Sequence, residues 1–122
     1  MRKIRNSFHA LNHDRLLRDP FVCVLPYDAL GLLMKLHCIV GSTVRGYESG
    51  YLCYEDGPRL TVSDLLYLLS RGNSDQEPPI HKNLKLLMHC RQLKCSKPDL
   101  KGDGHLKLCF WQSDLEEAAN EF

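Results

Sequence analysis

The stretch "LKCSKPDLKGDGHLKLCFW", residues 93–111, decides the fold, because it is the clearest local structure signal in the chain. Two short alternating runs flank a middle that contains Pro98, Gly102 and Gly104, which are residue types that form turns. In the second run the large apolar residues alternate with other residues, so one face can pack on the domain while the other meets water. The stretch therefore predicts a β-hairpin. Its lysines are Lys94, Lys97, Lys101 and Lys107.

Three helices are predicted upstream of the hairpin, and the first is the central one. It runs from Pro26 to Gly41, because proline suits the first turn of a helix and glycine ends one. Its apolar residues follow helical spacing, which predicts a broad buried stripe. The residues of this stripe are Leu30, Leu33, Met34, His37 and Val40, widened by Leu32, Leu36 and Ile39.

The other two helices follow closely, and the last has a basic face. Thr61 and Asp64 have the spacing of a capping box, which starts a short helix that Gly72 ends. The third helix starts at Ile80 and closes at Leu93, with apolar residues at helical spacing on its inner side. Its outer side carries His81, Lys82, Lys85, His89 and Gln92.

The segments between these elements are predicted to be mostly irregular. Residues 12–26 are expected to form one turn of helix and then an extended apolar piece, and residues 42–50 a polar connection. "GYLCY", residues 50–54, is a strand candidate because a turn signal follows it. Residues 73–79, "NSDQEPP", are expected to break the chain before the third helix.

Length and composition are those of one globular domain. The 122 residues suffice for one core, and 43% hydrophobic and 25% charged residues favour neither disorder nor a membrane span. We expect the domain to cover residues 1–112. Residues 113–122 are acidic, and Ser113 and Glu116 have capping-box spacing, so this tail is expected to start a helix or a linker to a further region. The N-terminal residues lack the apolar core of an export signal, so we expect a cytoplasmic protein.

The six cysteines are predicted to be reduced, because they are scattered and no export signal accompanies them. Cys23, Cys38 and Cys53 lie in apolar runs, where a free cysteine behaves as a small hydrophobic residue. Histidine and cysteine are adjacent at residues 37–38 and 89–90, but adjacent helical positions point about 100° apart, so no metal site is expected. No catalytic motif is present, and a cysteine–histidine nucleophile pair would have to come from residues distant in sequence. We expect neither catalysis nor a cofactor.

Charge is distributed unevenly although the net charge is only +1. Residues 81–107 carry seven lysines and arginines against two acidic residues, whereas residues 46–79 carry six acidic residues against two arginines. Such an asymmetry predicts a one-sided electrostatic surface, provided that folding keeps each block together.

The predicted order of helix, short strand, short helix, basic helix and hairpin is that of a winged helix-turn-helix domain, a mainly α fold with a small β-hairpin. The chain resembles the N-terminal winged-helix domains of phage replisome organisers and the related DnaD-type replication initiation proteins. The resemblance spans residues 8–112, and only the link "SRGNSDQEPP" is longer than the usual turn of three to four residues. It lies in "LLRDPFVCVLPYDALGLLMKLHCIV", "GYL", "LTVSDLLYLL", "NLKLLMHCRQLKC" and "GHLKLCFWQ".

This resemblance implies a role in phage or prophage DNA replication initiation, with double-stranded DNA, a second copy of the chain and helicase-loading proteins as partners. A helix-turn-helix domain places its second helix in the major groove, and hairpin lysines neutralise phosphates without reading sequence. The candidate nucleic-acid-binding residues are His81, Lys82, Asn83, Lys85, His89, Lys94, Lys97, Lys101 and Lys107.

Other interpretations of the same residues stay open. The basic residues of the third helix are also what a solvent-exposed helix face would carry. The lysines of the hairpin could instead protect an exposed strand from unwanted pairing. A winged helix can also regulate transcription, or serve as an interaction or oligomerisation module without binding DNA. In the last case we expect an exposed aromatic patch, because aromatic residues are enriched in interface cores. The candidates for this patch are Tyr47, Tyr51, Tyr54, Phe110 and Trp111.

Overall fold

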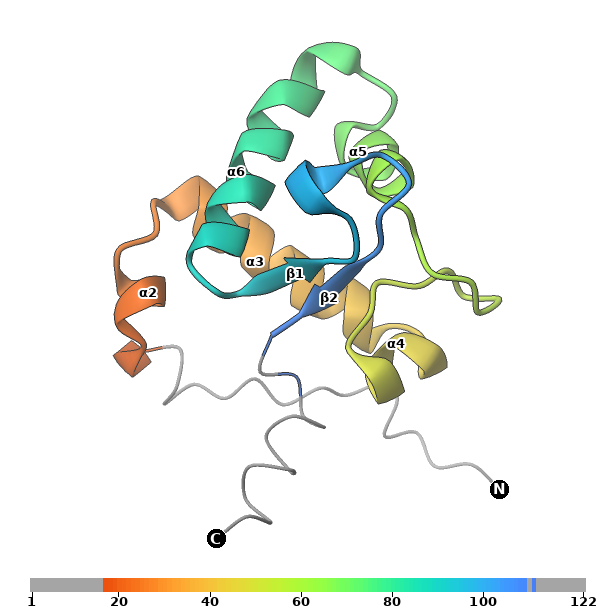
Figure 1. The fold of residues 1–122 in the computed structure, drawn as a ribbon, viewed down its shortest axis with the longest axis horizontal. Helices are drawn as coiled ribbons and strands as arrows, with labels where there is room; N and C mark the ends of the chain where they lie inside the picture. The colour runs from red at the N-terminus through yellow and green to blue at the C-terminus, as the bar shows by residue number, and fades with distance from the viewer. Residues whose placement is uncertain (1–16, 110, 112–122) are drawn as a thin grey trace, which may run out of the picture.

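Helix α3, Tyr27–Gly41, crosses the middle of the fold in the computed structural model, which describes residues 17–109 and 111 (Figure 1). Its position and its end are as predicted, but it begins one residue after the predicted Pro26, which is the N-cap. The helix ends at Gly41 without a left-handed glycine, because the C-cap Ser42 keeps right-handed backbone angles. The buried side of α3 consists of Ala29, Leu33, Leu36, His37 and Val40.

Helices α5, Val62–Ser70, and α6, Glu77–His89, pack against each other, and α6 also packs on α3. The predicted capping box at the start of α5 is confirmed. The Asp64 amide donates to the Thr61 hydroxyl over 3.1 Å, and the Thr61 amide donates to the Asp64 carboxylate over 3.4 Å. A hydrogen bond from the Tyr54 hydroxyl, followed by the bonds from Thr61, lowers the pKa of Asp64. The carboxylate is therefore ionised at neutral pH and accepts both sets of bonds.

Thr61→Ala is expected to lower the free energy of unfolding by about 1 kcal/mol, because the Asp64 amide loses its acceptor. Thermal unfolding followed by circular dichroism measures this loss. The control is Ser63→Ala in the same first turn, whose exposed side chain caps no amide in the described residues and should change stability by less than about 0.5 kcal/mol. Equal losses for the two variants would contradict the capping role.

The link between α5 and α6 is more ordered than the sequence suggested. The 3-10 turn η2, Ser74–Gln76, leads directly into α6, which begins three residues before the predicted Ile80. The helix also ends before the predicted Leu93, at His89, because Leu93 pairs with Leu108 as the first residue of a strand. The expected break before the third helix is confirmed, but it ends at Gln76 and not at Pro79, because prolines 78 and 79 lie in the first helical turn, where a missing amide costs nothing. Six residues, 71–76, separate the two α-helices, and the last three of them form η2, so the link is still longer than the three to four residues usual in a helix-turn-helix.

The predicted hairpin is confirmed as strands β1, Leu93–Cys95, and β2, Leu106–Leu108, which pair antiparallel. Three main helices thus precede a two-stranded hairpin, so the domain is mainly helical, as predicted. Register places Leu93 opposite Leu108 and Lys94 opposite Lys107. The leucines on one face are buried in the core, and the lysines lie on the other face.

The loop between β1 and β2 lies against α5 and is not a free tip (Figure 1). The carbonyls of Gly104 and Gly102 accept the amides of Val62 and Ser63, over 2.9 and 3.1 Å. These are first-turn amides of α5 that have no partner within the helix, so the loop caps the helix. The 3-10 turn η3 within the loop, Pro98–Leu100, also places its leucine in the core.

Two segments predicted as irregular are helical. Helix α2, Pro20–Cys23, replaces the expected extended piece, because the Asp19 carboxylate accepts the Phe21 amide and caps the turn. Helix α4, Val44–Ser49, replaces the expected polar connection at 42–50, with the Thr43 hydroxyl as its cap. Both caps were visible in the sequence, but neither helix has the length that gives a recognisable period.

The predicted strand at 50–54 is reduced to isolated bridges. Tyr51 pairs with Lys107 of β2, and Cys53 pairs with Arg59 after a tight turn at 54–57. The Leu52 amide donates to the Leu106 carbonyl over 3.0 Å, so this segment lies alongside β2 without forming a regular third strand. Its pairing is limited to single bridges with different partners, so the strand prediction fails in part.

Trp111 is fully buried, which contradicts its expected place in an exposed aromatic patch. Its indole Nε1 donates to the Tyr47 carbonyl over 2.6 Å, and its ring lies 5.8 Å from the ring of His37. Tyr47 and Tyr51 are half-buried, so of the proposed patch only Tyr54 is exposed among the described residues. Phe110 lies outside the described residues, as do the predicted capping box at 113–116 and the expected tail.

Gln92 is also buried, although the sequence placed it on the polar side of the third helix. It follows the end of α6, and its side-chain amide donates to the Cys90 carbonyl and to the Asp19 carboxylate. This polar side chain joins the α6–β1 connection to α2. None of the helices in the described residues combines the length and the apolar character that a bilayer crossing requires.

Candidate nucleic-acid interface

The outer face of α6 carries three of the predicted residues. Lys82, Lys85 and His89 are exposed and follow one another at spacings of three and four, so they lie on one side of the helix. The opposite side is fixed in the core by Leu84 and Leu87. Packing therefore holds the basic face outward along the length of α6.

His81 and Asn83 lie on the two flanks of α6. A shallow groove of about 520 Å³ separates α5 from the first turns of α6, with Leu66 lining one side and His81 the other, beside Lys82. Asn83 turns the other way, toward α3, where its side-chain amide donates to the Asp28 carboxylate over 3.3 Å. The structure thus brings Lys82, Lys85 and His89 together, with His81 at their edge, and separates Asn83 from them.

The outer face of the hairpin forms a second basic surface, which includes a residue that sequence reasoning missed. Lys94 and Lys107 are directly opposite, and Lys107 is in turn opposite Tyr51. The Lys107 ammonium lies 5.8 Å from the centre of the Tyr51 ring, and the Arg59 guanidinium carbon lies 3.7 Å from it. One aromatic ring therefore holds two cations from distant parts of the chain. We call Lys94, Lys107, Tyr51 and Arg59 the sheet face.

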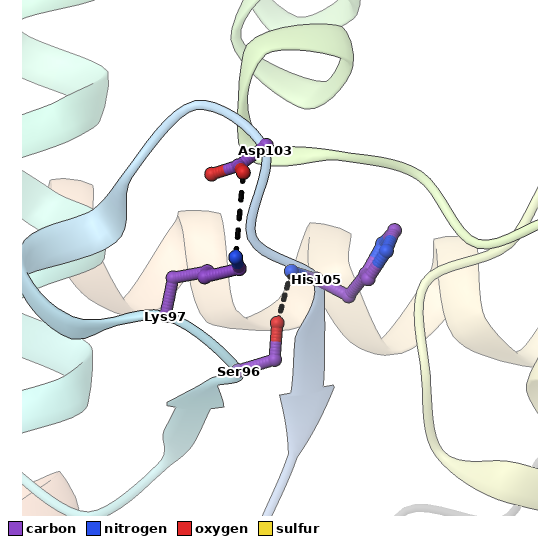
Figure 2. A network of polar contacts seen from close by, with 4 residues as sticks. All are labelled: Ser96, Lys97, Asp103 and His105. Atoms are coloured by element: carbon purple, nitrogen blue, oxygen red, sulfur yellow. Dashed lines mark hydrogen bonds and ion pairs between the residues drawn. The ribbon is translucent and has the colours of Figure 1, made fainter.

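The lysines of the β1–β2 loop are exposed, but one of them is paired. Figure 2 shows Lys97 and Asp103 facing each other across the loop, with the ammonium 3.5 Å from a carboxylate oxygen. The Ser96 hydroxyl accepts the His105 amide over 2.8 Å at the base of the same loop (Figure 2). The pair is solvent-exposed and therefore weak, so a phosphate can compete with Asp103 for Lys97. Lys101 is exposed beside it.

His105 connects this loop to the segment that carries Arg59. Its ring Nδ1 lies 3.1 Å from the Leu60 carbonyl, and because a carbonyl only accepts, Nδ1 carries the proton. His105 also pairs with Thr61 through an isolated bridge. The chain around residues 59–61 is thereby held against β2, which keeps Arg59 beside Lys107.

Arg59 and Arg45 were not among the predicted site residues. Both lie close to Cys53, where each lowers the pKa of the thiol, although burial has the larger effect and raises it. The turn signal at 55–58 and the alternation before it were visible in the sequence. A hairpin drawn through that turn would have paired Arg59 with Cys53 and placed it on the same face as Tyr51.

No group of three or more metal-ligating side chains occurs in residues 17–109 and 111. The six cysteines are free, but Cys23 and Cys38 are exposed, which contradicts their expected role as buried apolar residues. Both lie on helical turns whose inner positions are taken by larger apolar side chains. Cys53 is buried, as expected.

Comparisons with protein-family models, with curated proteins and with solved structures found no match to this chain.

Proposed function

We propose that this chain is a winged-helix domain that binds the phosphates of double-stranded DNA, with α6 as the recognition helix and β1–β2 as the wing. The observation that carries the proposal is the basic face of α6. Lys82, Lys85 and His89 are exposed on a helix that follows α5 and precedes the hairpin. A helix of this kind, presented on one side of a small domain, fits the major groove.

The sheet face gives the proposal a second support. Lys94 and Lys107 are directly opposite each other, so two cationic side chains lie on one face of the hairpin. A phosphate near this face can accept hydrogen bonds from ammonium groups. Contacts of this type fix a protein on the duplex and release counterions, without reading bases.

The resemblance to replisome organisers extends this proposal to the initiation of phage or prophage DNA replication in the cytoplasm. Within it, the chain would self-associate and contact helicase-loading proteins. A role in transcription uses the same DNA contacts and differs only in the partner.

The experiment that tests DNA binding is fluorescence anisotropy of a labelled random duplex, titrated at several salt concentrations. We expect Lys82→Glu with Lys85→Glu to weaken binding by about tenfold or more and to reduce the salt slope by about 2, since each phosphate contact contributes about 0.9. The control, Arg18→Glu with Lys35→Glu, changes the net charge equally on exposed residues outside both basic surfaces. Equal weakening by both variants would attribute binding to net charge alone and overturn the role of α6.

The second candidate is a protein-interaction module, and α5 supplies the observation that favours it. Tyr67 and Leu68 are 65% and 53% exposed, side by side on the helix that borders the groove. Large exposed apolar side chains of this kind occur at interface cores. If the wild-type chain does not bind the duplex even at low salt, DNA binding is refuted, and sedimentation of the wild type beside Tyr67→Ser with Leu68→Ser then tests self-association.

A further inference from the structure

A hollow of about 540 Å³ lies between α4 and the turn at 54–58. Arg45 of α4 lines one side of it and Arg59 lines the other, with the buried Cys53 between them. Glu48 and Ser49 complete the α4 side. Two guanidinium groups from separate segments therefore border one open pocket.

Arg59 is held in place by two contacts. It pairs with Cys53 through a backbone bridge, and its guanidinium carbon lies 3.7 Å from the centre of the Tyr51 ring. Stacking on an aromatic ring leaves the edge of the guanidinium, with its N–H groups, free to donate. The side chain is thus oriented before any ligand arrives.

Arg45 is accommodated by a glycine that no other residue can replace without strain. Gly57 has φ +118°, and a Cβ at this position would lie 3.2 Å from Nε of Arg45. The absent side chain lets the Arg45 side chain lie against the turn. A side chain at position 57 would therefore strain the turn and would also press on the Arg45 side chain.

The positive charge in the pocket exceeds the negative charge. Glu48 is the one carboxylate among the lining residues, and neither arginine forms an ion pair with a carboxylate within residues 17–109 and 111. Burial raises the pKa of the Cys53 thiol despite both arginines, so at neutral pH the thiol is protonated and does not neutralise them. The pocket can accept an anion from outside.

We propose that Arg45 and Arg59 form a phosphate-binding pocket. Planar guanidinium groups match phosphate oxygens with paired N–H donors, and arginine is enriched at such sites for that reason. The proposal rests on the proposed function for the source of the phosphate, which is the DNA backbone. Arg59 shares the Tyr51 ring with Lys107, so the pocket continues the sheet face and lengthens the phosphate track beyond the hairpin.

The test follows the side-chain Nε–Hε signals of arginine by nuclear magnetic resonance while the wild-type chain is titrated with a short DNA duplex and, separately, with pyrophosphate. We expect both ligands to shift the signals of Arg45 and Arg59, which are assigned from Arg45→Gln and Arg59→Gln. Dispersion of the backbone amide signals shows that each variant is folded.

Affinity for DNA is measured in parallel by anisotropy. Arg45→Gln with Arg59→Gln should reduce the salt slope by about 2, whereas Arg18→Gln with Arg71→Gln, an equal loss of charge at exposed positions outside the pocket, should leave it unchanged. Glu48→Gln removes the opposing carboxylate and should tighten binding of both ligands.

The outcomes separate this proposal from the one on which it rests. If neither ligand shifts the two arginine signals while Lys82→Glu with Lys85→Glu still weakens DNA binding, the pocket is refuted and the DNA-binding function stands. If pyrophosphate shifts the signals but the duplex does not bind, the pocket holds free phosphate compounds, and the proposed function is the part that fails.

Discussion

Replacing Trp111 with alanine is expected to lower the free energy of unfolding by about 3 to 5 kcal/mol, a large part of the stability of a domain of this size. The side chain is fully buried, and its removal leaves a cavity between α3 and α4. The ring of Tyr47 meets the indole edge-on at 6.3 Å, and Cβ of Trp111 approaches the Gly50 backbone so closely that a Cβ there would lie 3.0 Å away. The loss therefore includes contacts with α3, with α4 and with the Gly50 C-cap of α4.

Chemical denaturation followed by circular dichroism measures this prediction. Trp111→Phe keeps most of the ring volume but removes the donor to the Tyr47 carbonyl, and should cost roughly 1 to 3 kcal/mol. Tyr27→Ala is the matched control, because this aromatic side chain is 91% exposed and its loss should change stability by less than about 0.5 kcal/mol. A Trp111→Ala variant as stable as Tyr27→Ala would show that the indole is not part of the core.

Gly46→Ala is expected to destabilise the domain by about 1 to 3 kcal/mol, although alanine is the better helix former. A Cβ at this position of α4 would lie 2.5 Å from the Val40 carbonyl oxygen and 3.0 Å from that of Tyr51. Backbone atoms cannot move aside as a flexible side chain does, so α4 itself has to shift. Since Arg45 precedes this glycine, the shift should also weaken phosphate binding in the proposed pocket.

The control for this prediction is Gly31→Ala in α3, where a Cβ would meet nothing within 4 Å. The same substitution is expected to stabilise the domain there by about 0.4 to 1 kcal/mol, because alanine restricts the unfolded chain without a clash. The two variants should thus shift the midpoint of thermal unfolding in opposite directions. Stabilisation by both would mean that α4 does not approach α3 as closely as described.

The main helices and the hairpin could be predicted from sequence because their signals are local. The capping box at Thr61, the apolar stripe of α3 and the alternation at 106–108 each involve residues within a few positions of one another. Errors arose where a contact from elsewhere decides the conformation. The loop at 96–105 lies on α5, because the first-turn amides of that helix need acceptors, and nothing in the local pattern of the hairpin predicts this contact.

The candidate site was predictable only where it lies on one helix. Helical spacing alone places Lys82, Lys85 and His89 on one face, and the structure keeps them together. The turn signal at 55–58 could have placed Arg59 beside Tyr51, but no local pattern predicts that both meet Lys107 from the basic block of the sequence. The distribution of charge along the sequence does not predict which charged side chains lie together, because strand pairing brings distant segments side by side.

The sequence by itself determined the three main helices and the hairpin, and which face of α6 is basic. Periodicity and capping act within a few residues, and hydrophobic burial then fixes the inner side of each element. Only the tertiary structure decided that Trp111 fills the core, that Asn83 turns to Asp28, and that Arg45 and Arg59 border one pocket. These outcomes depend on close packing and on pairing between residues far apart in the chain, which no local pattern records.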